Sequence, residues 1–128
     1  MTSESKPDER LMEKLVFLGR ALEDKKASEV LALDVGRYSS AFEGIVLASA
    51  QSRRHARSLA DHLLELIKEH GLEYLGMEGF QEGEWILLDL NDVIVHIFVQ
   101  ETREFYNLEG FWSRGRMVEL QHGGGEDA

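Results

Sequence analysis

Cysteine is absent from the 128 residues, and proline occurs only once, at Pro7. The first absence excludes disulfides, cysteine nucleophiles and cysteine-based metal sites. Apolar runs are also short, because none approaches the roughly 18 residues that a membrane helix needs. The first ten residues carry Glu4, Asp8 and Glu9 without an apolar stretch, which fits neither a secretory signal nor a transit peptide. We therefore expect a cytoplasmic chain with no membrane partner.

Positive charge is scarce as well. The sequence has 14 Lys and Arg against 24 Asp and Glu, which gives a net charge of −10. Because phosphate contact needs clustered Lys and Arg, this balance argues against DNA or RNA binding by the surface as a whole. It favours a basic protein as partner, since complementary fields speed encounter. The alternative is that the acidity serves solubility alone.

The length of the chain predicts a single domain, and its glycine-rich, acidic end, residues 123–128, is expected to be disordered. Expected helices span residues 7–26, 52–70 and 101–108, and expected strands span residues 29–35, 45–50, 72–77, 85–90 and 93–99. The order α-β-β-α-β-β-β-α indicates an α/β (α+β) fold, in which a small mixed sheet is flanked by helices.

Local signals place the ends of these helices. Pro7 suits a first helical turn, and Lys25 and Lys26 suit the negative end of the first helix. Ser52 and Thr102 are expected to be the N-caps of the second and third helices.

The last two strands carry the most information about function. Asn91-Asp92 between them is a two-residue hairpin loop, so Leu90 should pair with Val93. One face of the hairpin is then entirely aliphatic and forms core, with the pairs Leu90–Val93, Leu88–Val95 and Ile86–Ile97. The other, which we call the mixed face, carries the pairs Trp85–Phe98, Leu87–His96 and Asp89–Ile94. Aromatic residues with a few polar groups are typical of interface cores, although another element could cover this face.

A basic patch lies at the start of the second expected helix. Arg53, Arg54 and Arg57 fall in its first turns, where helix N-termini bind anions, so a phosphate of RNA or a nucleotide is a candidate ligand. The alternative is a solvated patch balanced by nearby acids. The histidines of this helix lack the i, i+4 spacing of a metal pair, and we expect no metal site and no cofactor.

Three stretches of the sequence together resemble the Iojap family, whose bacterial members are called ribosomal silencing factors. The first is residues 39–52, SSAFEGIVLASAQS, and the second is residues 76–79 with residues 83–89, GMEG and GEWILLD. The third is residues 92–98, DVIVHIF, continuing from Thr102 through residues 103–109 to Trp112. The third is the most specific, because strand chemistry alone does not explain its order and spacing.

The resemblance implies one domain over residues 1–112, followed by a C-terminal extension over residues 113–128 that becomes disordered toward its end. It also implies a nucleotidyltransferase-related fold and a binding protein, not an enzyme. The implied partner is the large ribosomal subunit, through its basic ribosomal protein number fourteen at the subunit interface. Occupying that site blocks joining of the small subunit and represses translation. The resemblance also favours a mixed face that is exposed and binds this partner, and it implies that a homodimer can form through the sheet. Gly44 replaces an aromatic residue of the family pattern, which would weaken a contact made by its strand.

A nucleotidyltransferase-like enzyme or nucleotide-binding protein is the competing function. That chemistry needs a Gly-Ser turn and paired carboxylates that hold two metal ions. The corresponding turn here is Ala50-Gln51-Ser52, and no Asp-x-Asp pair occurs in the sequence. A homodimer with an unrelated acidic surface is the third alternative.

Overall fold

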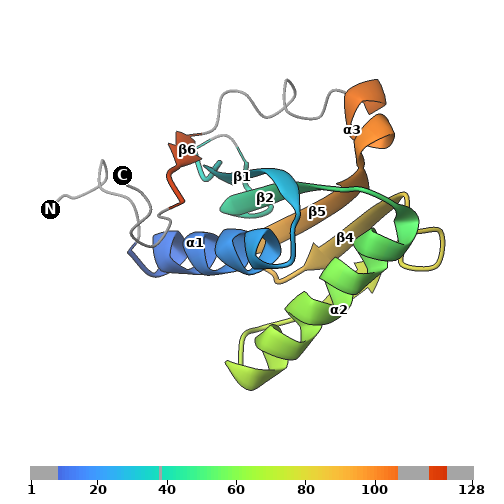
Figure 1. Ribbon diagram of the computed structural model, residues 1–128. Helices are drawn as coiled ribbons and strands as arrows, with labels where there is room; N and C mark the ends of the chain where they lie inside the picture. The colour runs from blue at the N-terminus through green and yellow to red at the C-terminus, as the bar shows by residue number, and fades with distance from the viewer. Residues whose placement is uncertain (1–8, 38, 107–115, 121–128) are drawn as a thin grey trace, which may run out of the picture.

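The computed structural model describes residues 9–37, 39–106 and 116–120 (Figure 1). Its helices are α1 (Glu9–Asp24), α2 (Arg53–Glu69) and α3 (Gln100–Tyr106). Its strands are β1 (Ser28–Asp34), β2 (Gly44–Ala50), β3 (Gly76–Glu78), β4 (Trp85–Asp89), β5 (Val93–Val99) and β6 (Arg116–Val118). None of the helices in these ranges is long and apolar enough to cross a membrane.

The strands form one sheet in the order β3-β4-β5-β2-β1-β6. β2 and β5 run parallel at its centre, and the other neighbouring pairs in the described ranges are antiparallel. α1 and α2 cover one face of the sheet, whereas α3 lies on the opposite side (Figure 1). The expected α+β fold with a mixed sheet is therefore confirmed.

The main core lies between the sheet and helices α1 and α2. Leu15, Leu18 and Leu22 recur at helical spacing along α1, and all three are fully buried. The sheet presents to them the aliphatic face that the hairpin predicted, with Ile86, Leu88, Val95 and Ile97 fully buried. Alternation along β4 and β5 thus sends one set of side chains to the helices and leaves the other set on the mixed face.

α2 begins where its capping signal placed it. The Ser52 Oγ accepts a hydrogen bond from the His55 backbone N at 3.0 Å. The His55 ring makes two further hydrogen bonds. Its Nδ1 accepts from the Gln51 backbone N at 3.0 Å, and its Nε2 donates to the Lys25 carbonyl at 2.9 Å. This histidine fixes the start of α2 against the connection between α1 and β1.

The ends of the other helices differ from expectation. α1 ends at Asp24, because Lys26 takes a positive φ of 71° that a right-handed helix cannot contain. α3 begins at Gln100, so Thr102 lies inside the helix and the expectation that it is the N-cap was wrong. The proposed start at Pro7 and the proposed end at residue 108 lie outside the described residues.

Two strands also differ from the sequence analysis. The strand expected over residues 72–77 is the shorter β3, shifted toward Glu78, where it pairs with β4. β6 lies within the expected C-terminal extension and was not predicted, yet it pairs with β1 at the edge of the sheet. The expected disordered tail, residues 123–128, lies outside the described residues. β6 therefore joins the sheet although its own sequence shows no strand pattern.

Candidate functional site

The hairpin of β4 and β5 has the register that its loop predicted. The Leu90 backbone N donates to the Val93 carbonyl at 2.9 Å, which closes the two-residue turn. Trp85 faces Phe98 across the strands. Leu87 faces His96, and Asp89 faces Ile94. The six residues proposed from the sequence as a partner-binding surface therefore do lie on one face.

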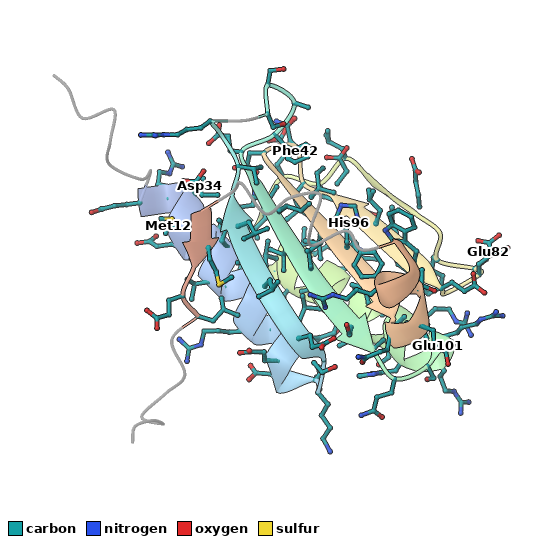
Figure 2. The ribbon with its side chains drawn as sticks, turned by 90° about the horizontal axis from the view of Figure 1, so that it is seen from above. Met12, Asp34, Phe42, Glu82, His96 and Glu101 are labelled. Atoms are coloured by element: carbon teal, nitrogen blue, oxygen red, sulfur yellow. The ribbon has the colours of Figure 1, made fainter. Side chains whose placement is uncertain are left out.

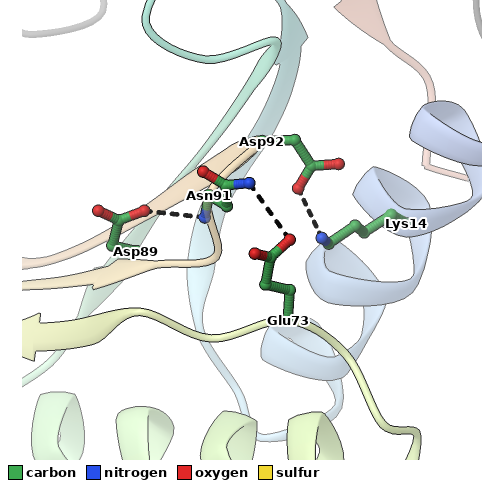
Figure 3. A network of polar contacts seen from close by, with 5 residues as sticks. All are labelled: Lys14, Glu73, Asp89, Asn91 and Asp92. Atoms are coloured by element: carbon green, nitrogen blue, oxygen red, sulfur yellow. Dashed lines mark hydrogen bonds and ion pairs between the residues drawn. The ribbon is translucent and has the colours of Figure 1, made fainter.

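Polar contacts fix the turn of this hairpin from several sides (Figure 3). The Asp89 Oδ1 accepts from the Asn91 backbone N at 2.8 Å, and Asn91 has a positive φ of 77°. The Asn91 Nδ2 donates to the Glu73 Oε1 at 3.2 Å. The Lys14 Nζ of α1 is 2.6 Å from the Asp92 Oδ1. The turn is thus tied to α1 and to the segment before β3, which holds the mixed face in place.

The mixed face, on which Figure 2 labels His96, is part core and part surface. Phe98 is fully buried, and Ile94 is only 9% exposed. Trp85, Leu87, Asp89 and His96 are half-buried. The expectation that the whole face is exposed was therefore wrong for Phe98 and Ile94. The accessible part is a strip of two aromatic rings, one leucine and one carboxylate.

Phe98 is buried because its neighbours across the sheet are also apolar. It belongs to a second hydrophobic cluster on this face, with Leu33, Val35, Ile45 and Leu47, all of them buried. Trp85 packs against the edge of the same cluster. β1 and β2 therefore supply the contacts that the hairpin sequence alone could not reveal.

A buried arginine secures α3 beside this cluster. Arg103 is 2% exposed, and its Nη1 donates to the Glu29 carbonyl at 2.6 Å and to the Ser49 Oγ at 2.8 Å. The Ser49 hydroxyl also lies 3.3 Å from the Glu29 Oε1. Because Ser49 pairs with Phe98 in the register of β2 and β5, these bonds hold α3 close to Phe98. The sequence analysis gave Arg103 no role, since only the folded chain brings these residues together.

Three aromatic rings form the middle of the mixed face. The His96 and Phe98 rings are stacked, with centroids 5.9 Å apart and an interplanar angle of 7°. The Trp85 ring is tilted against both, at centroid distances of 6.0 Å from His96 and 5.5 Å from Phe98. The Trp85 Nε1 donates to the His96 Nδ1 at 3.0 Å, which assigns His96 as the tautomer protonated at Nε2. Trp85 and His96 therefore orient each other.

His96 is held in its neutral form. Desolvation by burial lowers the pKa of His96 from 6.5 to about 4, because a buried imidazolium loses hydration. A proton on Nδ1 would also remove the acceptor that the Trp85 indole uses. At neutral pH this part of the strip carries no positive charge of its own.

The stability of the fold should fall in acid as a result. Between pH 6.5 and about 4 the unfolded chain binds a proton at His96 that the folded chain does not. The free energy of unfolding should therefore decrease as pH falls through this window, by about 1 kcal/mol per pH unit. Urea unfolding of the parent and of His96→Gln at several pH values measures this. Equal pH slopes for the two proteins would contradict it.

Asp89 contributes to folding as well as to the surface. Asp89→Lys removes the acceptor for the Asn91 backbone N, so it should cost about 1 kcal/mol of stability. Asp89→Asn keeps that oxygen and is the matched control. Thermal unfolding of the two variants compares them. A Lys variant as stable as the Asn variant would show that the turn does not depend on this bond.

The basic patch is largely engaged within the chain. Arg53 forms an ion pair with Glu84, and the Arg57 Nη1 donates to the Gln81 carbonyl at 3.0 Å. Gly83, with a positive φ of 75°, packs directly against both arginines. Arg54 is exposed. Two of the three arginines thus hold the loop before β4, and their part in binding an anion stays a prediction.

Gly44 lies on the helix side of β2 and not on the mixed face. A Cβ built there would lie 2.8 Å from the Leu15 Cδ2 of α1. The glycine therefore permits close packing of α1, and its departure from the family pattern removes nothing from the mixed face. Among the described residues, no group of three or more His, Asp or Glu side chains is arranged to hold a metal ion.

Comparison with known proteins identifies the family. The model of the family described as ribosomal silencing factor during starvation, RsfS, matches residues 8–128. The ribosomal silencing factor RsfS of Bacillus subtilis is 34% identical over 109 residues, which are 85% of this chain and 92% of the relative. That of Chromobacterium violaceum is 36% identical over 92 residues, 72% of this chain and 75% of the relative.

A solved structure agrees with the sequence comparison. The crystal structure of a Chromobacterium violaceum protein superposes with a TM-score of 0.75 at 31% identity. The match covers 94% of this chain and 98% of that one. The fold and these comparisons thus define a small α+β protein of the Iojap class. The chain belongs to the ribosomal silencing factor family.

Proposed function

We propose that this chain is a translation repressor that docks through its mixed face onto ribosomal protein number fourteen of the large subunit. Bound there, it blocks joining of the small subunit. The protein acts by occupying a surface in the cytoplasm and is not an enzyme. Membership of the ribosomal silencing factor family supports the ribosomal role, and the half-buried strip of the mixed face supports the mode of docking.

The composition of the strip carries the proposal. Trp85 and Leu87 offer apolar area, while His96 holds the indole in one orientation. Aromatic side chains that are fixed before binding lose little entropy in an interface. Asp89 lies at the end of the strip and can meet a Lys or Arg. The net charge of −10 adds attraction to a basic partner over a longer range.

Sedimentation and subunit joining test the proposal in two steps. Purified protein is mixed with isolated large subunits and separated on a sucrose gradient, with small subunits alone as the control. We expect the protein to travel with large subunits only. Small subunits are then added, and fewer joined ribosomes should form than without the protein. A protein that stays at the top of the gradient, or unchanged joining, would reject the proposal.

Salt should weaken this association. Exposed charges are screened over about 8 Å at physiological ionic strength, so attraction between an acidic chain and a basic protein falls as salt rises. The rate of association should change more than the rate of dissociation. Surface-immobilised large subunits and a salt series measure both rates. Association rates that are indifferent to salt would mean that the net charge plays no part.

A further inference from the structure

The helix side of the molecule carries an apolar groove that the proposed function does not use. It has a volume of about 880 Å³ and lies between α1, α2 and β6. Ligand-binding cavities typically measure roughly 300 to 1,000 Å³. Met12, Val16 and Phe17 of α1 and Leu66 of α2 line it, and all four are only half-buried. We call this surface the α1–α2 groove.

The lining of the α1–α2 groove has the form of a helix-binding surface. Met12 and Val16 stand one turn apart on α1, and His62 and Leu66 stand one turn apart on α2. An amphipathic helix docks into such a groove with side chains spaced three or four residues apart. The methionine adds a flexible side chain that adapts to the shape of a partner.

Charge at the rim of the groove selects the kind of helix. Among the described side chains that line the groove, Glu13, Asp24 and Glu119 are exposed, against one guanidinium, that of Arg20. Acidic groups around an apolar floor complement an amphipathic helix with Lys or Arg on its flanks. The whole chain, at −10, attracts such a helix as well.

Other occupants fit less well. A second copy of the chain would bring another −10 toward an acidic rim. The chain's own segment 121–128, QHGGGEDA, follows Leu120 beside the groove but has no large apolar residue and carries two acids. The segment 1–8, MTSESKPD, has only Met1 as a large apolar residue. Neither terminus supplies the apolar face that the groove needs.

We propose that the α1–α2 groove is a second docking site, which takes a basic amphipathic helix of a partner protein. The groove and the mixed face lie on opposite sides of the sheet, so both can be occupied at once. The protein would then join a second partner to the surface that its mixed face binds.

A model peptide tests the site directly. The probe is a fluorescein-labelled peptide of leucine and lysine, ordered so that its helix has one apolar and one basic face. Titration with the full chain should give saturable binding in fluorescence anisotropy, at least about tenfold tighter than a scrambled peptide of the same composition. Equal binding of the scrambled peptide would show only general charge attraction, and absent binding would reject the site.

Neutral substitutions in the groove locate the contact. Val16→Asn and Leu66→Gln should each weaken binding of the peptide by about tenfold. Leu75→Gln changes a leucine that is 59% exposed beside β3, and it is the matched control that should bind as the parent does. Thermal unfolding of each variant shows whether it is folded. Groove variants that fold and bind like the control would overturn the proposal.

Two further measurements make the result decisive. If a groove variant fails to fold, methyl NMR of the parent replaces it, and peptide addition must shift Val16 and Leu66 and leave Leu75 unchanged. Glu119→Gln should weaken binding about twofold, whereas Glu82→Gln, a matched exposed change far from the groove, should not. Methyl shifts confined to other surfaces would reject the site.

The groove and the mixed face can fail independently. Trp85→Ala should lose large-subunit binding and keep peptide binding, and Val16→Asn should do the reverse. If the parent protein does not bind large subunits but binds the peptide in the groove, only the proposed function is rejected. Loss of both activities in Val16→Asn, with its fold intact, would reject the separation of the two sites.

Discussion

Replacing Trp85 with alanine is expected to weaken binding to the large ribosomal subunit by about thirtyfold or more. The change removes the largest ring of the accessible strip and leaves the His96 Nδ1 without its donor. Trp85→Phe keeps an aromatic ring but not the indole N–H, so its affinity should fall between those of the parent and the alanine variant. Equilibrium binding of labelled protein to purified large subunits measures the three affinities.

The control separates lost contact from a weakened fold. Trp85 packs against the second hydrophobic cluster, so Trp85→Ala should also lower the unfolding temperature somewhat. Phe80→Ala removes a half-buried ring that packs against the main core instead. It should lower stability and leave affinity unchanged. If Trp85→Ala binds like the parent, or if Phe80→Ala loses affinity equally, the mixed face is not the interface.

Replacing Phe98 with alanine is expected to cost about 3 to 5 kcal/mol of stability. Phe98 is fully buried, and its ring lies against both Trp85 and His96, so its removal leaves a cavity beneath the strip. Leu88→Ala, in the main core of the same hairpin, should cost about 2 to 5 kcal/mol. Urea unfolding at neutral pH measures both.

A third variant, Leu87→Ala, completes the comparison of how much the two faces of the hairpin contribute to stability. Leu87 lies on the mixed face and is half-buried, so Leu87→Ala should cost clearly less stability than Phe98→Ala or Leu88→Ala. If Phe98→Ala is nearly as stable as the parent while Leu88→Ala is not, the second cluster contributes little to folding. Similar losses for Phe98 and Leu88 would show that the sheet is stabilised from both faces.

The features of the site that were predicted correctly depend on residues that are close together in the sequence. A two-residue loop fixes the register of a hairpin, so the pairing of Trp85 with Phe98 followed from Asn91-Asp92 and from alternation alone. Burial depends on what packs from elsewhere. The neighbours that bury Phe98 come mainly from β1 and β2, and the sequence of β4 and β5 does not indicate which residues will pack there.

Short and tertiary features escaped prediction for a similar reason. β6 has three residues, too few to show alternation, and it is a strand because β1 offers it a free edge. Arg53 and Arg57 formed a basic patch in the sequence, but their partners in the loop before β4 lie 31 and 24 residues away along the chain. Their engagement could be seen only once the chain was folded.

The parallel pairing of β2 and β5 has a consequence for synthesis on the ribosome. β2 is fully buried along its length, yet Gly44 pairs with Val93 and Ala50 with Val99. One edge of this apolar strand therefore stays unpaired until the second half of the chain has been made, since contacts distant in sequence form late. The hairpin of β4 and β5 closes from neighbouring residues and can arrive preformed. The nascent chain is thus most vulnerable to wrong pairing, and most in need of protection, between the emergence of Ala50 and that of Val99.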